Sequence, residues 1–426
     1  MTLVRPPQML AFVAAVVALA ACGGEPSGTG KDAAAPVPTA QAGAPPRQEP
    51  LVGGPYPSLL VTQAQFVEKD GKPIPGPAKL LIVRNTPEGW KTVTIEDPDS
   101  NVFHKAIAYE TGILTIGATK AALKAWIFAN GTWNQRTIWQ PTFGGKFDRL
   151  RDIEVGDVDH DGQEDLVIAT HDQGVIGVVH PFAGRPWTIE EVDREPDTFV
   201  HEIEIGDING DGKLEFFATP SKPNKVDEQQ TGEVRVYRKT EEGWSKATVE
   251  ASLTTHAKEI LTADVDGDKS SELYAVWEGT IGKDGKLETP VQVKEYRLMS
   301  GPGGGMFVQR LVAEIPDRQM RSLEAGDVNG DGKIDLVGSS LKKGIWLFER
   351  NADGWKVTNI DDNSSGYEHP LHLADLDGDG KLEIYVASED QGELNCLRWK
   401  GGKFEKSVVI PLNKGDITWN ITDGRF

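Results

Sequence analysis

The chain is poor in cysteine, in basic residues and in long apolar runs. It has only two cysteines, Cys22 and Cys396, among 426 residues, so no framework of disulfides holds it together. Asp and Glu outnumber Lys and Arg by 65 to 45, and the formal charge of −20 argues against binding to nucleic acid or to anionic lipid surfaces. No segment shows a sustained helical period, which points to a β protein.

The one apolar run lies at the N-terminus. The segment MLAFVAAVVALAAC follows a single basic residue, Arg5, and is shorter than the roughly 20 residues that a membrane-spanning helix needs. Its last four residues, Leu-Ala-Ala-Cys, resemble the bacterial lipobox, which implies an acylated Cys22. The alternative is an ordinary small-residue cleavage site with a chance cysteine. We predict a lipoprotein signal peptide over residues 1–21.

The residues after Cys22 predict a tether. Residues 23–55 are rich in Pro, Ala and Gly and have almost no large apolar side chains, so they cannot bury enough surface to fold. Random-coil scaling gives this segment a reach on the order of 30 Å. Residues 22–55 therefore form an acylated, disordered anchor, and residues 56–426 remain for the folded domain. Gly23 in place of Asp favours the bacterial outer membrane as the location of this exported protein.

What the chain has in abundance is one acidic loop. The pattern Asp-x-Asp/Asn-x-Asp, with Gly at the sixth position in four copies and an acid at the ninth, begins at Asp157, Asp207, Asp264, Asp327 and Asp375. The first aspartates are separated by 50, 57, 63 and 48 residues. This is the length of a four-stranded propeller blade, with kelch-like repeats of about 50 residues as an example.

A second marker gives the number of repeats. An aromatic residue is followed five residues later by Ile or Val in seven places: Trp90/Ile95, Trp133/Ile138, Trp187/Val192, Trp244/Val249, Phe307/Val312, Trp355/Ile360 and Phe404/Val409. The second unit has Glu110 where the first Asp belongs, and the first unit lacks an inner strand. The last segment, 415–426, ends in a remnant of the loop, Asp423-Gly424. We predict an all-β, seven-bladed β-propeller whose first blade is closed by the C-terminal strand.

The acidic loops resemble FG-GAP/VCBS repeats, the calcium-loop units of integrin α-chain propellers and of many exported bacterial proteins. The resemblance extends through the loops over roughly residues 100–426, and over 58–99 only through the outer-strand pattern. It implies the fold but no single function, because binding proteins, lyases and dehydratases all carry such repeats.

The loop spacing predicts calcium sites. Side chains at the first, third and fifth positions converge, the seventh position offers a backbone carbonyl, and the acid at the ninth closes the shell. An EF-hand would instead close with Glu at position 12 between two helices. Plain Asp-Gly turns are the alternative. Up to five Ca²⁺ are predicted, with the 264–272 site weakest because Lys269 replaces the glycine. The predicted ligand positions are Asp157, Asp159, Asp161, Gln163, Asp165, Asp207, Asn209, Asp211, Lys213, Glu215, Asp264, Asp266, Asp268, Ser270, Glu272, Asp327, Asn329, Asp331, Lys333, Asp335, Asp375, Asp377, Asp379, Lys381 and Glu383.

Basic residues recur at a second position of the repeat. Six residues before the first loop position, at the start of each inner strand, stand His104, Arg151, His201, Lys258, Arg321 and His369. Acids follow on the same strands, at Asp152, Glu154, Glu202, Glu204, Glu259 and Glu324. The bases and acids form either a structural belt or a convergent site for a carboxylated or phosphorylated ligand or a sugar. Either arrangement lies on the face opposite the acidic loops.

These features favour a calcium-stabilised binding module at the cell envelope. It would contact the membrane only through the lipid on Cys22 and bind a glycan or protein partner at the basic mouth, with the acidic loops turned toward the membrane. One alternative is a polysaccharide lyase or dehydratase-like enzyme that uses His104, His201, His369 or His372. Another is a passive envelope scaffold. No nucleophile elbow, phosphate loop or clustered Cys/His motif is present, which argues against an enzyme.

Overall fold

The computed structural model describes residues 55–145, 148–171, 173–181, 187–223, 230–299 and 305–426. The predicted signal peptide, Cys22 and all but the last residue of the tether lie outside this part of the chain. Within it, no helix is long and apolar enough to cross a membrane. Cys396 is a free, buried cysteine.

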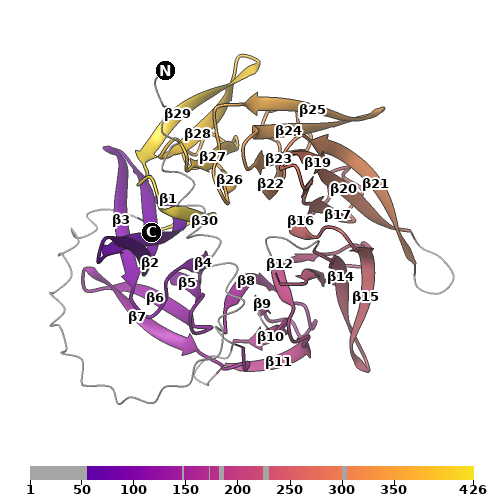
Figure 1. Cartoon of the computed structure of the whole chain (residues 1–426), viewed down its shortest axis with the longest axis horizontal. Helices are drawn as coiled ribbons and strands as arrows, with labels where there is room; N and C mark the ends of the chain where they lie inside the picture. The colour runs from indigo at the N-terminus through magenta and orange to yellow at the C-terminus, as the bar shows by residue number, and fades with distance from the viewer. Residues whose placement is uncertain (1–54, 146–147, 172, 182–186, 224–229, 300–304) are drawn as a thin grey trace.

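Seven four-stranded antiparallel sheets surround a central axis in the described residues (Figure 1). The strands of each blade are given from the axis outward. Blade 1 consists of β30 (Ile417–Arg425), β1 (Pro57–Lys69), β2 (Lys72–Thr86) and β3 (Gly89–Asp97), and blade 2 of β4 (Phe103–Tyr109), β5 (Gly112–Gly117), β6 (Leu123–Ala129) and β7 (Thr132–Trp139). Blade 3 consists of β8 (Leu150–Gly156), β9 (Asp165–Thr170), β10 (Ile176–His180) and β11 (Thr188–Asp193), and blade 4 of β12 (Phe199–Gly206), β13 (Glu215–Ser221), β14 (Gly232–Thr240) and β15 (Gly243–Ser252).

Blade 5 consists of β16 (Ala257–Ala263), β17 (Glu272–Trp277), β20 (Val291–Met299) and β21 (Met306–Ile315). Blade 6 consists of β22 (Met320–Gly326), β23 (Asp335–Ser340), β24 (Gly344–Asn351) and β25 (Gly354–Asp361). Blade 7 consists of β26 (Leu371–Ala374), β27 (Glu383–Ser388), β28 (Glu393–Lys400) and β29 (Lys403–Pro411). A two-stranded hairpin of β18 (Thr280–Ile281) and β19 (Leu287–Thr289) extends from blade 5. The seven aromatic pairs lie on or beside the outermost strands, so the predicted seven-bladed, all-β fold is confirmed.

The C-terminal strand closes the ring. β30 pairs antiparallel with β1 from Pro57↔Arg425 to Ala64↔Ile417, and it is the innermost strand of blade 1. The first and last described strands thus share one sheet, as the missing inner strand of the first unit predicted. Closure matters because it leaves no blade without a neighbour on either side.

The core lies between the blades. Val167 and Ala169 of blade 3 pack with Ile203, Phe216 and Tyr237 of blade 4, and all five are buried. Equivalent clusters fill the other blade interfaces, including the one between blades 7 and 1. Along each inner strand, successive side chains point in opposite directions. One set packs between the blades, and the other set faces the axis.

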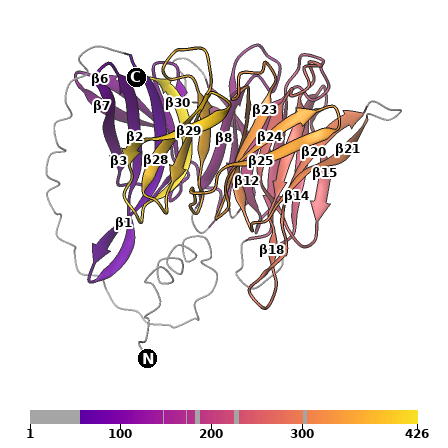
Figure 2. The ribbon, with the colours of Figure 1, turned by 90° about the horizontal axis from the view of Figure 1, so that it is seen from above.

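The two faces of the propeller differ in what they carry. Each acidic loop joins the first and second strands of its blade, and β30 ends on the same face. Tyr56 and Phe426 exchange backbone hydrogen bonds of 3.0 Å, so the described chain begins on this face as well. The β18–β19 hairpin projects from the opposite face (Figure 2). The start of the domain therefore lies with the acidic loops.

Candidate functional site

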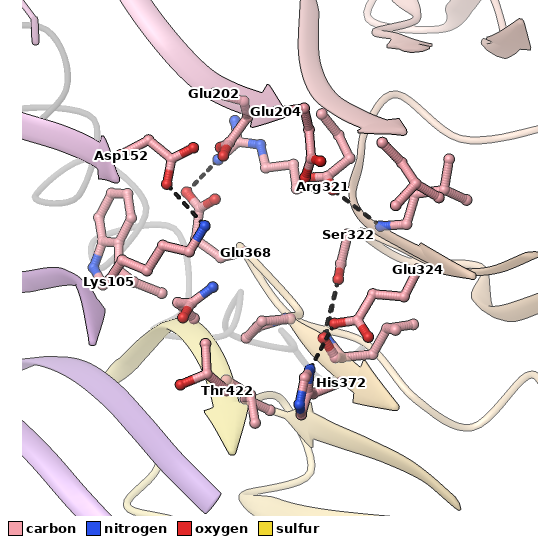
Figure 3. A pocket seen from close by; sticks show the side chains of 18 of the residues that line it. Lys105, Asp152, Glu202, Glu204, Arg321, Ser322, Glu324, Glu368, His372 and Thr422 are labelled. Atoms are coloured by element: carbon pink, nitrogen blue, oxygen red, sulfur yellow. Dashed lines mark hydrogen bonds and ion pairs between the residues drawn. The ribbon is translucent and has the colours of Figure 1, made fainter. Parts of the chain in front are cut away.

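A cavity of about 440 Å³ lies on the propeller axis. Every blade contributes residues to it from its innermost strand, and the wall is dominated by charged groups of both signs (Figure 3). The charged side chains that line it are Lys105, Arg151, Asp152, Glu154, Glu202, Glu204, Lys258, Glu259, Arg321, Glu324, Glu368 and His372. All six acids predicted from the repeat pattern are among them.

The cavity brings together four of the six predicted basic residues: His104, Arg151, Lys258 and Arg321. The other two, His201 and His369, do not line it. His369 is fully buried and its ring nitrogens lie 2.8 Å from the carbonyl oxygen of Ser340 and 2.7 Å from Ser364 Oγ. His369 therefore has a full set of structural partners.

Two of these four basic residues are held by buried acids. Arg321 pairs with Glu278, at 3.4 Å from Nε to Oε1, and with Glu368, while Lys258 Nζ lies 3.8 Å from Glu278. Burial and the adjacent Arg321 lower the pKa of Lys258 to about 8. Burial alone would raise the pKa of Glu278, but Lys258, His256 and Arg321 outweigh it and lower the pKa to about 2. This side of the mouth has the geometry of a structural belt.

The sequence pattern did not identify Glu278 and Glu368. Glu278 follows β17 and Glu368 precedes β26, so neither occupies the repeated position on which the other acids were found. Their alignment with Arg321 is set by the packing of neighbouring blades and leaves no signal in the spacing.

Arg151 is held more loosely and stands beside an aromatic ring. Its Nη2 lies 3.5 Å from Glu202, and its guanidinium carbon lies 5.3 Å from the ring centroid of Trp419 on β30. Trp419 also meets His104 edge to face at 4.9 Å. Its indole Nε1 is buried without a hydrogen-bond partner although the residue lines the cavity. A buried indole N–H normally has an acceptor, so this donor is unsatisfied in the described structure.

Carboxyl groups dominate the rest of the wall. Lys105 Nζ contacts Asp152 at 3.1 Å and also pairs with Glu154 (Figure 3). Burial, reinforced by neighbouring carboxylates, raises the pKa values of Glu202, Glu204 and Glu259 well above the usual value. Carboxyl groups that keep their protons can both donate and accept hydrogen bonds, which suits a ligand rich in hydroxyls.

His372 is the charged histidine of the cavity. Its Nδ1 lies 2.9 Å from Glu324 and its Nε2 lies 3.0 Å from Asp423, which joins blade 7 to blade 1. Burial alone would lower the pKa of His372, but the two carboxylates outweigh it and raise the pKa to about 10. A protonated imidazole with both nitrogens occupied donates two structural hydrogen bonds.

A row of four histidines, of which His171 is half-buried and the others are buried, runs beside the mouth from blade 2 to blade 5. Ring centroids are 6.3 Å apart for His104 and His171, 5.0 Å for His171 and His201, and 5.7 Å for His201 and His256. Burial and nearby cations lower the pKa values of all four, to about 3 for His256. None of the convergent metal-ligand groups in the described residues includes these histidines.

On the opposite face, the acidic loops share one backbone shape. In the second loop Asp207 accepts hydrogen bonds from the backbone N–H groups of Gly210 and Gly212, and Asn209 accepts one from Asp211. The same bonds recur in the loops that begin at Asp264, Asp327 and Asp375. The sixth position has φ between 77° and 88° in all five, with Lys269 at 77°. A lysine there is strained where glycine is free.

The acid at the ninth position is buried in every loop. Asp165, Glu215, Glu272, Asp335 and Glu383 are each no more than 5% exposed. Burial raises the pKa of each, to about 7 for Glu272 and Asp335. A buried carboxylate requires a positive partner, so these positions fit a bound cation.

The carboxylates of three loops, those that begin at Asp157, Asp264 and Asp375, also converge as metal ligands do. In the part of the chain that the structure describes, four groups place their ligand atoms within 4.8 Å of one another, and all lie at acidic loops: Asp157/Asp159/Asp161, Asp159/Asp165/His180, Asp264/Asp266/Asp268/Glu272 and Asp375/Asp377/Asp379/Glu383. Asp157 Oδ1 and Asp335 Oδ2 are buried without hydrogen-bond partners. The donors are mostly hard oxygens, which suits Ca²⁺.

The fourth loop is also where a family signature is found. Residues 327–386, which include that loop and continue into blade 7, match the model of the FG-GAP-like repeat. The chain carries an FG-GAP-like repeat. The resemblance predicted from the loop spacing is thereby confirmed, within a seven-bladed propeller. No curated protein sequence matches the chain.

Solved propellers share the fold at low sequence identity. A candidate 6-phosphogluconolactonase of Bacteroides fragilis is 13% identical, with a TM-score of 0.52, and covers 86% of this chain and 98% of its own. A second candidate 6-phosphogluconolactonase, from Bacteroides uniformis, is 14% identical with a TM-score of 0.51. The match covers 86% of this chain and 99% of the Bacteroides uniformis chain. At this identity the likeness concerns the architecture alone.

Proposed function

We propose that this protein is an exported, lipid-anchored propeller that binds an acidic glycan at the mouth of its central cavity. Arg151 would pair with a carboxylate or phosphate of the ligand, and Trp419 would contact a sugar ring and donate its indole N–H. The protonated carboxyl groups of Glu202 and Glu259 would hydrogen-bond hydroxyls. The observation that carries the proposal is the unpaired indole N–H of Trp419 beside a loosely held arginine in a polar cavity.

The anchor belongs to the same proposal. The lipobox-like Cys22 would hold the chain to the bacterial outer membrane, and the described domain begins at the acidic-loop face. An anchor attached there would turn the cavity mouth away from the membrane. Each acyl chain adds about 0.8 kcal/mol per buried methylene, so a multiply acylated terminus suffices without a spanning helix.

Calcium in the acidic loops is the third part of the proposal. The buried ninth-position acids and the unpartnered oxygens of Asp157 and Asp335 support it. The carboxylates at the first, third, fifth and ninth positions would hold the ion, together with the seventh carbonyl. Its role would be structural, since the loops lie on the face opposite the cavity mouth.

An enzymatic function receives less support. His369 has structural partners on both nitrogens, and His201 lies outside the cavity with Nε2 3.1 Å from Ser221 Oγ. Neither is placed to abstract a proton from a ligand in the cavity. A protein partner at the same mouth is the remaining alternative to a glycan.

Binding of uronate-containing and neutral oligosaccharides, measured by calorimetry, tests the proposal. The wild-type protein should bind the acidic set saturably, without products detectable by mass spectrometry. Arg151→Ala and Trp419→Ala should each weaken binding at least tenfold, because each removes a contact that neutral wall residues do not replace. Arg136→Ala, on the exposed outer strand β7, is the matched control and should bind as wild type.

Two results would contradict the proposal. If Arg151→Ala and Trp419→Ala lower the melting temperature but leave saccharide binding intact, these residues belong to a structural belt. If unsaturated products accumulate, the protein is a lyase.

A further inference from the structure

The five acidic loops differ in the residue that faces the ninth-position acid across the blade. In each of these blades the second and third strands are antiparallel, and the paired residues nearest the loop are Leu166↔Val179, Phe216↔Tyr237, Leu273↔Tyr296, Leu336↔Phe348 and Ile384↔Leu397. One step further, it places Asp165 opposite His180, Glu215 opposite Arg238, Glu272 opposite Arg297, Asp335 opposite Glu349 and Glu383 opposite Arg398. Four loops thus face a basic residue, and the fourth faces an acid.

In three loops this residue is an arginine that contacts the predicted calcium ligands. Arg297 Nη2 lies 2.6 Å from Asp266 and 2.7 Å from Glu272, the third and ninth positions of one loop. Arg350 of the next blade adds a second guanidinium at 3.3 Å from Asp266.

The second and fifth loops show looser versions of the same contact. Arg238 Nε lies 3.3 Å from Glu215. Arg398 Nε lies 3.5 Å from Asp377 and 3.7 Å from Glu383. In each case a side chain of the protein itself supplies the positive charge that the buried acid requires.

Among the residues that the structure describes, no such internal cation contacts the fourth loop. Asp335 is 2% exposed, and its Oδ2 accepts no hydrogen bond in the described structure. Glu349 adds a further carboxylate from β24 and pairs with Lys356, which is 63% exposed and therefore strongly screened by solvent. A buried, unpartnered carboxylate oxygen next to three further acids, Asp327, Asp331 and Glu349, is costly in its charged form unless a cation from solution binds it, and the alternative is a bound proton.

We infer that the loop at 327–335, completed by Glu349, is the principal divalent-cation site of this protein, and that guanidinium groups replace the ion in the loops that begin at Asp207, Asp264 and Asp375. The inference rests on the calcium part of the proposed function. Of the five predicted calcium sites it leaves two, those in the first and fourth loops. In the first loop His180 Nδ1 lies 2.7 Å from Asp165, and an imidazole there can ligate an ion rather than exclude it.

A reciprocal exchange of charge tests this assignment, with Ca²⁺ alone as the probe in calorimetric titrations of the whole soluble domain. Glu349→Arg gives the fourth loop the residue that the fifth loop has, and should abolish one binding event or weaken it at least tenfold. Arg398→Glu makes the fifth loop resemble the fourth, and should add one binding event. Arg398→Gln separates loss of the arginine from gain of a ligand.

Matched controls carry the same charge changes on exposed outer strands. Glu405→Arg on β29 and Arg136→Glu on β7 should bind Ca²⁺ as wild type does. Far-UV circular dichroism should show a folded propeller for every variant. Glu349→Gln, which removes the charge without adding an arginine, gives the same test at lower risk to folding and should also weaken binding.

The outcomes separate this inference from the broader proposal. Unchanged titrations for Glu349→Arg and Glu349→Gln would overturn the assignment of the principal site. An Arg398→Glu variant that binds no more ions than Arg398→Gln would overturn the replacement of calcium by arginine. Absence of any Ca²⁺ binding by the wild-type protein would instead remove the calcium part of the proposed function.

Discussion

At the scale of single residues, burial and the neighbouring charges together decide which ionisable groups keep their charge. His372 stays protonated because two carboxylates flank it, whereas the histidines in the row beside the mouth are neutral because burial and nearby cations oppose protonation. Residues of one type on neighbouring strands thus serve opposite electrostatic roles. The sequence shows His104 and His201 at a repeated position but shows neither the burial of these histidines nor their neighbours.

The neutral histidines make stability fall in acid. Their folded-state pKa values lie below the unfolded value of about 6.5, so their contribution is fully present above pH 6.5 and is lost as the pH falls. Each should contribute a slope of about 1.4 kcal/mol per pH unit below 6.5. Urea denaturation at pH 7.5, 6.5 and 5.5 should therefore show a smaller slope for His201→Asn than for the wild-type protein.

A structural control distinguishes titration from simple loss of packing. Ser221→Ala removes the hydroxyl that His201 contacts but no titrating group. It should lower stability by about 1 kcal/mol at every pH and leave the slope unchanged. Equal slopes for His201→Asn and wild type would show that His201 takes up its proton in the folded state.

At the scale of elements, the closing strand is the most consequential single segment. β30 supplies the innermost strand of blade 1, the ring of Trp419 at the cavity and the Asp423 partner of His372. The sequence predicted this closure from the number of repeats. Seven outer-strand markers but only five acidic loops were present, and the last segment, 415–426, was left over to supply the inner strand that the first unit lacks. It did not predict the site, because Trp419 belongs to no repeated position.

Deletion of residues 413–426 should abolish cooperative folding. Without β30 the first blade loses its inner strand and exposes the edge of β1, and blades 7 and 2 lose a neighbour. We expect the calorimetric melt of the shortened protein to fall by more than about 10 °C or to disappear, with aggregation on gel filtration. Deletion of 31–44, an equally long part of the predicted tether, should leave the melt of the domain unchanged.

At the scale of the whole molecule, a net charge of −20 is held in a closed ring that has no disulfide among its described residues. Two groups of acids stand out, one in the acidic loops and one along the central cavity. Those in three of the loops meet arginine side chains, and those in the cavity share protons or pair with Lys105, Arg151, Arg321 and His372. Stability should therefore depend on bound calcium in a way that a neutral propeller would not show.

Removal of calcium should lower the melting temperature. With free Ca²⁺ ten to a hundred times above its Kd, one bound ion stabilises the fold by about 1.4 to 2.7 kcal/mol. For a domain of this size we expect a chelator to lower the melting temperature by about 2 to 5 °C in differential scanning calorimetry. Excess Ca²⁺ should restore it and Mg²⁺ should not, since Mg²⁺ demands a tighter octahedral shell. An unchanged melt would mean that the loops hold no ion of consequence.

The repeat spacing by itself determined the all-β propeller, its seven blades, its closure and the positions of the acidic loops, because each depends on local patterns that recur at a fixed period. Only the tertiary structure decided which acids meet which cations. Glu278 reaches Arg321 from the neighbouring blade, and Glu349 faces Asp335 from the next strand of the same blade, at a position where the other loops face a basic residue. Charge pairing depends on distances of a few ångströms between blades, and sequence spacing does not encode these distances.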